Sequence, residues 1–412
     1  MDKPIIATGH PYAFPYYFRV FEYLKNKPPH SLSEAESECG GKDDFIFILP
    51  KLWVAKRGKV RLKLEQKPEF TIFGLPAASY GGHGIGGLFK GWLPGIVFLL
   101  PYLKLKYKSK VLYSCSEPNL LTTFFNGIIA KLCGMKYIFF TWQNVVPEKY
   151  MSGLKLKVYK TLVKFNLRLA DGVICGNHKA VQIIEELKSK KCELRILISP
   201  IAGVDTEKFR PSIVSNWREK LGVKSEEKLI LFYGALDKRK GLNVLIDAYK
   251  ILNTRYEILD TKLIIIGTGP EQENLKLLTT HYSLLTKVIF LDWLPNDQLP
   301  ALLNTADVFV YPSVPSGGWE EQFGYAMAEA SACGVPVVAT HTGSIDEVVR
   351  DGETGLLVEP NNPERLVEAI AKVLSSENFA KQMGEKGREY VTQNFSHQII
   401  TDKIYNFLHK FL

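Results

Sequence analysis

The stretch Trp319-Glu-Glu-Gln-Phe-Gly-Tyr-Ala-Met-Ala-Glu-Ala-Ser-Ala-Cys-Gly-Val-Pro-Val-Val-Ala339 says more about the fold than any other part of the sequence. Its alanine, methionine and glutamate residues predict a helix over Gly324–Cys333, and Gly334 predicts where that helix ends. The apolar runs Val308–Tyr311 and Val335–Ala339 on either side predict buried strands. A helix between two such strands indicates a parallel sheet covered by helices.

The same alternation extends over the rest of the chain. Further strands are expected at Phe45–Leu49, Phe70–Phe73, Val111–Ser114, Tyr137–Thr141, Gly172–Cys175, Leu194–Ile198, Leu229–Tyr233, Leu263–Ile266 and Val288–Leu291. The length of 412 residues suits two or three domains. The sequence therefore predicts an α/β protein with a parallel sheet in each half.

The join between the halves is expected at the Pro-bounded loop Gly203–Pro211. We predict an N-terminal Rossmann-like domain over 1–203, a C-terminal one over 204–395, and a helix over 396–412 packing back toward the first domain. In open parallel sheets ligands bind beyond the carboxyl ends of the strands, so the site is expected in the cleft between the two domains.

The net charge of +9 is unevenly distributed. Residues 1–200 contain 30 Lys and Arg against 15 Asp and Glu, whereas residues 201–412 contain 22 against 28. A basic half can meet nucleic acid, an anionic membrane or an acidic substrate. Because no nucleic-acid recognition motif appears, we expect no nucleic-acid partner.

The basic residues of the first half accompany apolar ones. Four lysines follow the apolar run Trp92–Leu103, and within 149–171 basic residues recur on one helical face. This pattern predicts contact with an anionic membrane surface, with a solvated basic helix face as the alternative. Trp92–Leu103 is too short to span a bilayer and contains Pro94 and Pro101.

The six cysteines show no C-x-x-C spacing, and no signal peptide is visible. These observations favour reduced thiols and a cytoplasmic chain. Together with the basic half, they predict a peripheral location on the inner face of the membrane.

Two carboxylates flank the predicted helix start. Glu321 lies just before it, and Glu329 lies five residues after Gly324, about 7.5 Å along the axis at ~1.5 Å per residue. A helix N-terminus attracts anionic and hydroxyl-rich ligands, so this pair suits an extended ligand with two sugars. The alternatives are a helix-start carboxylate, a solvated Glu329, or a glycosidase acid–nucleophile pair.

A basic loop follows the strand at Leu229–Tyr233. Its sequence Gly234-Ala-Leu-Asp-Lys-Arg-Lys-Gly241 leads into a helix expected from about Leu242. Backbone donors and mobile cations in such a loop suit a pyrophosphate. A surface turn with solvated lysines is the alternative.

Together these segments resemble the retaining glycosyltransferases of family 4, the glycosyl transferases group 1, which have the two-domain GT-B architecture. The resemblance covers most of 195–395 and is weaker before residue 200. It rests on Glu321-x7-Glu329 enclosing Gln322-Phe323-Gly324, on Cys333–Ala339, on Gly343 with Ile345-x-Glu347-Val348-Val349, and on Asp351-Gly352-x-Thr354-Gly355-Leu-Leu-Val358.

The resemblance implies a role for each matching residue. Glu329 would bind the ribose of a nucleotide sugar, Glu321 the hydroxyls of the transferred sugar, and Lys240 the diphosphate. It implies Glu321, Lys240 and Arg239 as catalytic residues. It adds Gly234, Gln322, Phe323, Gly324, Gln143, Trp293 and Leu294 to Glu329 as donor-binding residues. No protein nucleophile, metal or cofactor is implied.

The sequence departs from the family in three places. Ala235 stands where the family usually has Arg, and Arg239 is the candidate to compensate. Gln143 stands where a His is common, and it can bind a sugar hydroxyl but cannot change charge near neutral pH. The first strand is followed by Thr8-Gly9-His10-Pro11-Tyr12 instead of a double-glycine loop.

The resemblance implies a metal-independent retaining transferase. It would move a hexose from a UDP- or GDP-sugar to a hydroxyl of a sugar or lipid-linked glycan. The alternatives are a non-catalytic nucleotide-sugar-binding protein and an epimerase or phosphorylase on the same fold.

Overall fold

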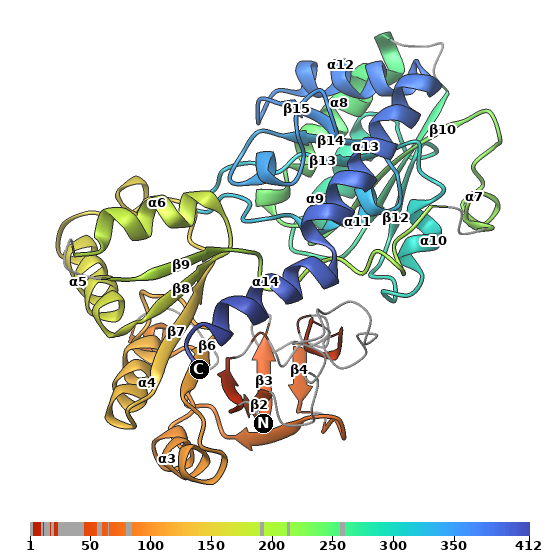
Figure 1. The fold of residues 1–412 in the computed structure, drawn as a ribbon. Coiled ribbons are helices and arrows are strands. Elements are labelled where there is room, and N and C mark those ends of the chain that lie inside the picture. The colour runs from red at the N-terminus through yellow and green to blue at the C-terminus, as the bar shows by residue number, and fades with distance from the viewer. Residues whose placement is uncertain are drawn as a thin grey trace. The chain divides into compact units, whose positions relative to one another are not determined.

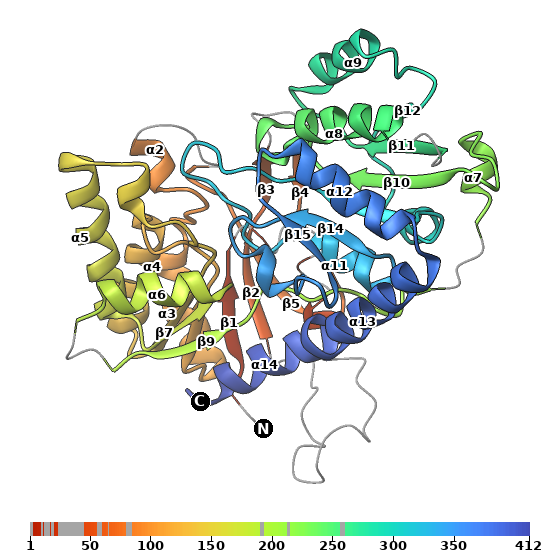
Figure 2. The ribbon, with the colours of Figure 1, turned by 90° about the horizontal axis from the view of Figure 1, so that it is seen from above.

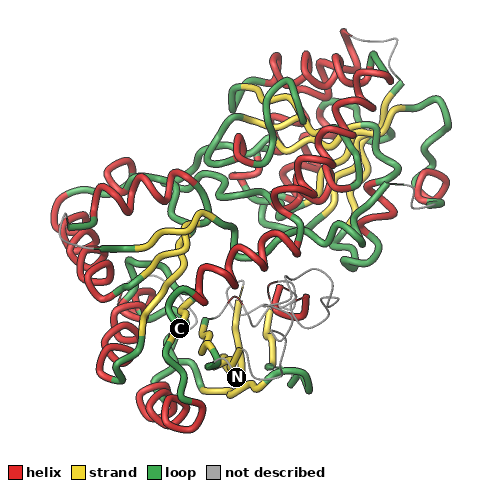
Figure 3. Tube along the Cα trace, viewed as in Figure 1, coloured by secondary structure: helices red, strands yellow, loops and turns green. Residues whose placement is uncertain are grey.

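In the computed structural model the described residues are 3–9, 11, 17, 20–23, 45–55, 60–64, 66–79, 85–189, 193–211, 215–255 and 260–412. His10, Tyr12, Cys39 and Cys192 lie outside these ranges. The chain divides into two compact units, Met1–Gly203 with His397–Leu412, and Val204–Ser396 (Figure 1). Both units contain helices and strands (Figure 3).

The first unit is built on a seven-stranded parallel sheet in the order β5-β2-β1-β6-β7-β8-β9. Its strands are β1 (Ile5–Thr8), β2 (Phe45–Pro50), β5 (Thr71–Leu75), β6 (Val111–Ser114), β7 (Lys136–Thr141), β8 (Gly172–Cys175) and β9 (Arg195–Ile198). An antiparallel hairpin, β3 (Leu52–Ala55) and β4 (Val60–Lys63), lies outside this sheet.

The helices of this unit connect successive strands. They are α2 (Ile85–Leu88), α3 (Ile96–Tyr107), α4 (Leu121–Leu132), η4 (Pro147–Lys149), α5 (Gly153–Leu169) and α6 (His178–Leu187). The buried face of α5 presents Tyr159, Val163 and Leu167 to a core that also contains Tyr137 and Phe139 of β7. The apolar face of α5 therefore packs into this core, opposite to solvent.

The last helix, α14 (His397–His409), also belongs to the first unit. Thr401 Oγ1 donates to the carbonyl of Val20 at 3.0 Å, and the ring of Tyr405 lies 6.3 Å from that of Phe45. Beyond the helix, the guanidinium of Arg195 donates to the carbonyl of Lys410. These contacts fix the end of the chain on the sheet where the chain began.

The second unit is built on a six-stranded parallel sheet in the order β12-β11-β10-β13-β14-β15. Its strands are β10 (Lys228–Tyr233), β11 (Thr261–Ile266), β12 (Val288–Leu291), β13 (Val308–Tyr311), β14 (Val337–Thr340) and β15 (Gly355–Val358). Its helices are α7 (Trp217–Lys220), η5 (Lys238–Lys240), α8 (Leu242–Arg255), α9 (Gln272–His281), α10 (Leu299–Leu303), α11 (Tyr325–Ala332), η6 (Ile345–Glu347), α12 (Pro363–Leu374) and α13 (Glu377–Phe395). Helix α8 packs beside α12, and α11 packs beside α13 (Figure 2).

Both sheets contain a point where the strand order reverses. In the first sheet it lies between β1 and β6, and in the second between β10 and β13. Loops that leave the carboxyl ends of two such strands diverge, and ligands of open α/β sheets bind between them. The second switch point is the place where Gly234–Gly241 and the loop before α11 begin.

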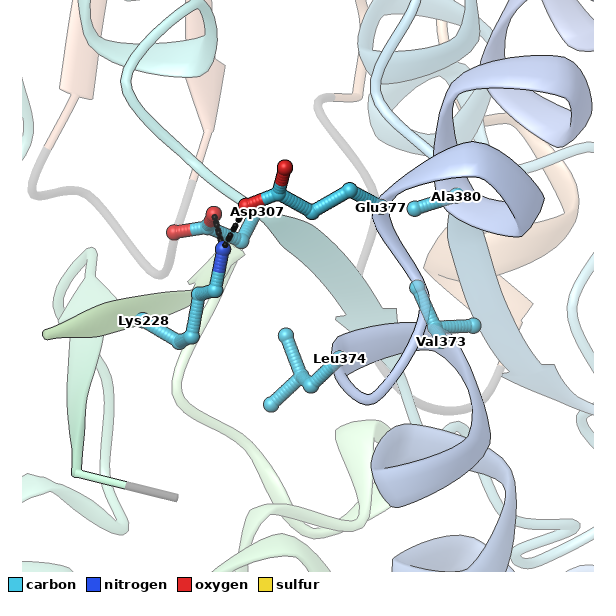
Figure 4. A pocket seen from close by; sticks show the side chains of 6 residues that line it. All are labelled: Lys228, Asp307, Val373, Leu374, Glu377 and Ala380. Atoms are coloured by element: carbon cyan, nitrogen blue, oxygen red, sulfur yellow. Dashed lines mark hydrogen bonds and ion pairs between the residues drawn. The ribbon is translucent and has the colours of Figure 1, made fainter. Parts of the chain in front are cut away.

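Ion pairs lie at the amino end of strand β10 in the second sheet, opposite to the switch point. Lys228 Nζ, at the start of β10, lies 3.4 Å from Asp307 and 3.1 Å from Glu377. These groups line a small cavity with Val373, Leu374 and Ala380 (Figure 4). Asp307 Oδ2 also accepts the backbone N–H of Leu229 at 2.7 Å. Both cavity carboxylates therefore have a cationic partner within the protein.

The predicted α/β class with a parallel sheet in each half is confirmed. The strand expected at Val335–Ala339 begins two residues later, at Val337. The hairpin β3–β4 and strand β15 were not expected from the sequence. The helix expected over Gly324–Cys333 spans Tyr325–Ala332, with Gly324 and Cys333 as its caps.

Candidate functional site

The second switch point brings Lys240 and Glu321 together. Lys240 ends the short helix η5 after β10, and Glu321 lies in the loop after β13. Lys240 Nζ lies 2.6 Å from Glu321 Oε2, and their side chains are 11% and 9% exposed. The two groups form a nearly buried ion pair between loops that leave neighbouring strands.

Tyr311 completes this cluster. As the last residue of β13, it directs its hydroxyl to Glu321 Oε2 at 2.9 Å and accepts a hydrogen bond from Lys240 Nζ. Ser313 Oγ lies 3.3 Å from the same carboxylate oxygen. Burial and the neighbouring Glu321 carboxylate raise the pKa of Tyr311, so its hydroxyl keeps its proton. One oxygen of Glu321, Oε2, is thus held by three donors.

Two glycines allow the loops to approach this closely. Gly241 has φ +62°, and a Cβ there would lie 2.0 Å from the carbonyl oxygen of Pro312. Gly343 has φ +60°, and a Cβ there would lie 1.9 Å from the carbonyl oxygen of Glu321. The backbone N–H of Ser344 donates to that same carbonyl at 2.9 Å. The loop after β14 therefore clamps the backbone of Glu321, and only glycine fits at its turn.

Glu329 lies in α11 and is 4% exposed, so it is not the solvated helix residue of the alternative interpretation. The hydroxyl of Tyr233, the last residue of β10, donates to Glu329 Oε2. Burial raises the pKa of Glu329 to about 8, although Lys208 opposes the shift. Each of the two carboxyl groups is therefore bound by the tyrosine that ends one of the two switch-point strands.

Arg239 is engaged by neighbouring side chains. Its guanidinium makes two hydrogen bonds to Asp237, at 3.2 Å and 2.7 Å, and lies 4.1 Å from the centre of the Trp319 ring. Its side chain is 38% exposed. The guanidinium is thus stacked beside the Lys240–Glu321 pair, because Lys240 Nζ also lies over Trp319, at 5.2 Å.

The first part of the basic loop packs on the loop after β11. A Cβ at Gly267 would lie 1.9 Å from the carbonyl oxygen of Gly234, and one at Gly269 would lie 2.1 Å from that of Leu236. The backbone N–H of Leu236 donates to the carbonyl of Thr268 at 3.1 Å. These contacts hold Gly234–Leu236 in one conformation at the end of β10.

The other residues predicted to bind the donor have different surroundings. Phe323 is buried against the rings of Tyr325 and Phe395, and Gly324 caps α11 with φ +82°. Gln322, which follows Glu321 in the sequence, is half-buried. Trp293 and Leu294 follow β12, two strands from β10, and Trp293 is 42% exposed. Gln143 belongs to the other unit, after β7.

Sequence reasoning missed Tyr233 and Tyr311. Both end apolar runs and count as apolar residues in a strand pattern, so their hydroxyl groups gave no separate signal. A signal was available in their position, since the last residue of a parallel strand lies at the edge where ligands bind.

The site offers acceptors for hydroxyl groups and a paired cation. Among the described residues, no group of three or more His, Cys, Asp or Glu side chains could hold a metal ion. The described cysteines Cys115, Cys133, Cys175 and Cys333 are free thiols. Across the same part of the chain, no helix is long and apolar enough to cross a membrane.

Residues 214–390 match the family described as glycosyl transferases group 1. The chain is 34% identical over 197 residues to the GDP-mannose-dependent alpha-(1-6)-phosphatidylinositol monomannoside mannosyltransferase of Mycolicibacterium smegmatis, covering 47% of this chain and 51% of that protein. It is 32% identical over 225 residues to the D-inositol 3-phosphate glycosyltransferase of Corynebacterium jeikeium, covering 52% of each. The chain thus spans about half the length of the curated relatives it matches.

Solved structures match over the whole chain. Anabaena HepE in complex with UDP superposes with a TM-score of 0.73 at 19% identity, covering 99% of this chain and 100% of that one. Sucrose-phosphate synthase from Thermosynechococcus elongatus gives 0.71 at 21% identity, covering 99% of both chains. At these identities the likeness is one of fold.

Proposed function

We propose that the protein is a glycosyltransferase, because residues 214–390 match the family described as glycosyl transferases group 1 and the chain has the predicted GT-B fold. It moves a hexose from a nucleotide-diphosphate sugar to a hydroxyl of a sugar or lipid-linked glycan. The observation that carries the proposal is the Lys240–Glu321 ion pair at the switch point of the second sheet.

The donor enters at this ion pair. The diphosphate forms an ion pair with Lys240 in place of Glu321. The Glu321 carboxylate then accepts hydrogen bonds from hydroxyls of the hexose. Departure of the nucleotide diphosphate builds negative charge, and a fixed cation at that position lowers the barrier.

Glu329 binds the ribose in this proposal. It lies on α11, five residues after the N-cap Gly324, and its buried carboxyl accepts one hydrogen bond from Tyr233. A carboxyl group accepts hydrogen bonds and, when protonated, also donates one, so ribose hydroxyls find partners there. Arg239 lies beside Lys240 and adds a second cation once the diphosphate competes with Asp237.

We also propose retention of configuration without a metal. Support comes from the resemblance to retaining glycosyltransferases, in which the leaving phosphate takes the proton of the acceptor hydroxyl on the front face. Lys240 and Arg239 supply positive charge at the diphosphate in this scheme. Glu321 then acts on the sugar hydroxyls and forms no bond to the sugar carbon.

The acceptor we propose presents a ring with several hydroxyl groups. The M. smegmatis relative acts on a phosphatidylinositol mannoside and the C. jeikeium relative on an inositol phosphate, by their names. A lipid-linked acceptor accords with the surface of the first unit. There α3, α4 and α5 pack side by side (Figure 1).

That surface combines apolar and basic side chains. Phe98 and Leu105 of α3 and Leu154 of α5 are 83%, 79% and 77% exposed. Exposed lysines accompany them, including Lys106, Lys108, Lys155, Lys157 and Lys164. Apolar side chains that enter the headgroup region beside lysines that meet anionic lipids are typical of interfacial membrane proteins. We therefore propose a peripheral location on the inner face of the cytoplasmic membrane.

Transfer is tested by incubating the protein with UDP-glucose or GDP-mannose and a lipid extract, followed by mass spectrometry. A hexose added to a lipid or glycan supports the proposal, and the anomeric proton coupling reports retention. A changed sugar nucleotide without acceptor indicates an epimerase. Binding of donor with no product in any mixture indicates a non-catalytic binding protein.

A further inference from the structure

The ring of Trp319 lies against two cations at once. Its centre is 4.1 Å from Cζ of Arg239 and 5.2 Å from Nζ of Lys240. Arg239 and Lys240 end the short helix η5 after β10, whereas Trp319 belongs to the loop after β13. The contact therefore joins the two loops that diverge at the switch point of the second sheet.

The backbone fixes Trp319 in this place. Ser316 and Trp319 exchange two backbone hydrogen bonds, at 3.0 Å and 2.9 Å, across a two-residue turn. Both residues of the turn are glycines, with φ +56° and +79°, and a tight turn of this kind needs positive φ at both positions. Nearer to β13, the N–H of Val314 donates to the carbonyl of Arg239 at 2.8 Å. The ring and the guanidinium are thus attached to backbone segments that are themselves hydrogen-bonded.

Part of the Arg239 guanidinium is left unused by the protein. Asp237 accepts from Nε at 3.2 Å and from Nη2 at 2.7 Å, and it also accepts the backbone N–H of Arg239 at 3.0 Å. A guanidinium has five N–H donors, and Nη1 donates to no residue that the structure describes. The attraction between a cation and a ring face occupies none of these donors. The N–H groups of Nη1 are therefore available to a phosphate oxygen.

An aromatic ring suits this position because it attracts both cations without carrying a charge. Arg239 and Lys240 are like charges on neighbouring residues, and each has a carboxylate partner, Asp237 and Glu321 respectively. An incoming phosphate competes with those carboxylates for the two cations. It does not compete with the ring, whose attraction for the guanidinium uses the ring face. The contact with Trp319 therefore persists when a diphosphate replaces the carboxylates.

We propose that Trp319 is a positioning residue, which holds the Arg239 guanidinium beside Lys240 as the second cation of a diphosphate-binding site. This inference rests on the proposed function, in which the diphosphate belongs to the sugar-nucleotide donor. Trp319 acts through Arg239. Loss of its ring leaves both cations in the chain but no longer fixes the guanidinium. Diphosphates should therefore lose more affinity than monophosphates, because the second cation serves the second phosphate.

The test measures affinities by isothermal titration calorimetry for three pairs of probes: UDP and UMP, GDP and GMP, and inorganic pyrophosphate and phosphate. Trp319→Leu is compared with the wild type and with Trp217→Leu, which removes a ring 5.1 Å from Lys220 in α7, before β10. We expect Trp319→Leu to weaken the diphosphates by about tenfold and the monophosphates by less than about threefold. Trp217→Leu should leave all affinities unchanged.

A double-mutant cycle shows whether Trp319 acts through Arg239. Arg239→Gln alone is expected to weaken the diphosphates by about tenfold, and adding Trp319→Leu should then cost little more. Lys220→Gln removes an exposed cation that also lies beside a ring and is the control for loss of charge. Trp319→Phe keeps an aromatic face and should retain most of the diphosphate affinity.

Unchanged diphosphate affinity in Trp319→Leu, equal losses for diphosphates and monophosphates, or additive losses in the cycle would each overturn the proposal. If Trp319→Leu does not fold, Arg239→Lys tests the same contact, because it keeps the charge and loses the planar group, and unchanged affinity would again overturn it. Pyrophosphate binding that depends on Trp319, without binding of UDP or GDP, supports the positioning role and counts against the sugar-nucleotide donor. If none of the diphosphates binds the wild type, both proposals fail.

Discussion

Lys240 Nζ and Glu321 Oε2 lie 2.6 Å apart although the two residues are 81 positions apart in the sequence. Their contact joins the loop after β10 to the loop after β13, at the reversal of the second sheet. Both side chains are nearly buried, so removing one of them leaves the other without its oppositely charged partner. A ligand with negative charge for Lys240 and hydroxyl groups for Glu321 replaces both halves of the pair at once.

Breaking the pair on one side is expected to cost stability. Lys240→Met leaves Glu321 buried without its cation, a change worth about 3–5 kcal/mol in buried pairs. The double variant Lys240→Met with Glu321→Gln is expected to recover much of that loss, since no charge is left alone. Urea denaturation of the wild type, Lys240→Met, Glu321→Gln and the double variant gives the coupling energy between the two side chains. Additive losses would contradict a direct ion pair.

The pH dependence of stability follows from Glu329. Its pKa is about 8 in the folded chain against 4.5 as the ordinary value, so between these values the unfolded chain has lost a proton that the folded chain keeps. Stability from this group is complete below about pH 4.5 and is lost as the pH rises through about 8, at up to ~1.4 kcal/mol per unit.

Glu329→Gln removes this titration and keeps an oxygen for the Tyr233 hydroxyl. Its free energy of unfolding is therefore expected to rise relative to the wild type between about pH 4.5 and pH 8. Urea denaturation at a series of pH values measures the difference. Parallel curves for the two proteins would show that Glu329 has an ordinary pKa.

Gly343 is expected to tolerate no side chain. Alanine there needs φ near +60° and places its Cβ against the carbonyl oxygen of Glu321. Gly317 provides the matched control, because its φ is +56° and nothing lies within 4 Å of its Cβ position. Both variants carry the backbone cost of about 1 kcal/mol, and only Gly343→Ala must also move Glu321. Nucleotide affinity should fall in Gly343→Ala alone, and equal affinities would argue against the clamp.

Membrane binding is expected to depend on α3. Flotation with vesicles that contain anionic lipid at low salt should carry the wild type upward. Phe98→Ser with Leu105→Ser should weaken it, as should charge reversal at Lys106 and Lys108, each worth about 1 kcal/mol. Leu277→Ser in α9 removes a side chain that is 68% exposed in the second unit and serves as the control. If the wild type does not float with the vesicles, the proposed membrane location is wrong.

Much of the fold is readable in the sequence because buried parallel strands are uninterrupted apolar runs. The runs Val288–Leu291 and Val308–Tyr311 match their strands residue for residue. The hairpin strand Val60–Lys63 carries Arg61 and Lys63, so its sequence lacks such a run. Strand β15, Gly355–Val358, was missed although it resembles the predicted strand Gly172–Cys175 in length and in its first residue.

The candidate site was less readable because its contacts join distant residues. Tyr233 meets Glu329 across 96 positions and Lys240 meets Tyr311 across 71. A linear pattern places each residue at a strand end but not opposite a particular partner. The stacking of Arg239 on Trp319 is likewise a consequence of how two loops fold.

The central claim is that the Lys240–Glu321 pair receives a nucleotide diphosphate. The most direct test is thermal unfolding of the wild type and of Lys240→Met with UDP and with GDP. A ligand that binds only the folded chain stabilises it, by about 2.7 kcal/mol when the ligand concentration is a hundred times Kd, and so raises its melting temperature. The account predicts that one of the two nucleotides stabilises the wild type and that Lys240→Met loses most of that shift. No shift with either nucleotide, or an equal shift in the variant, would contradict it.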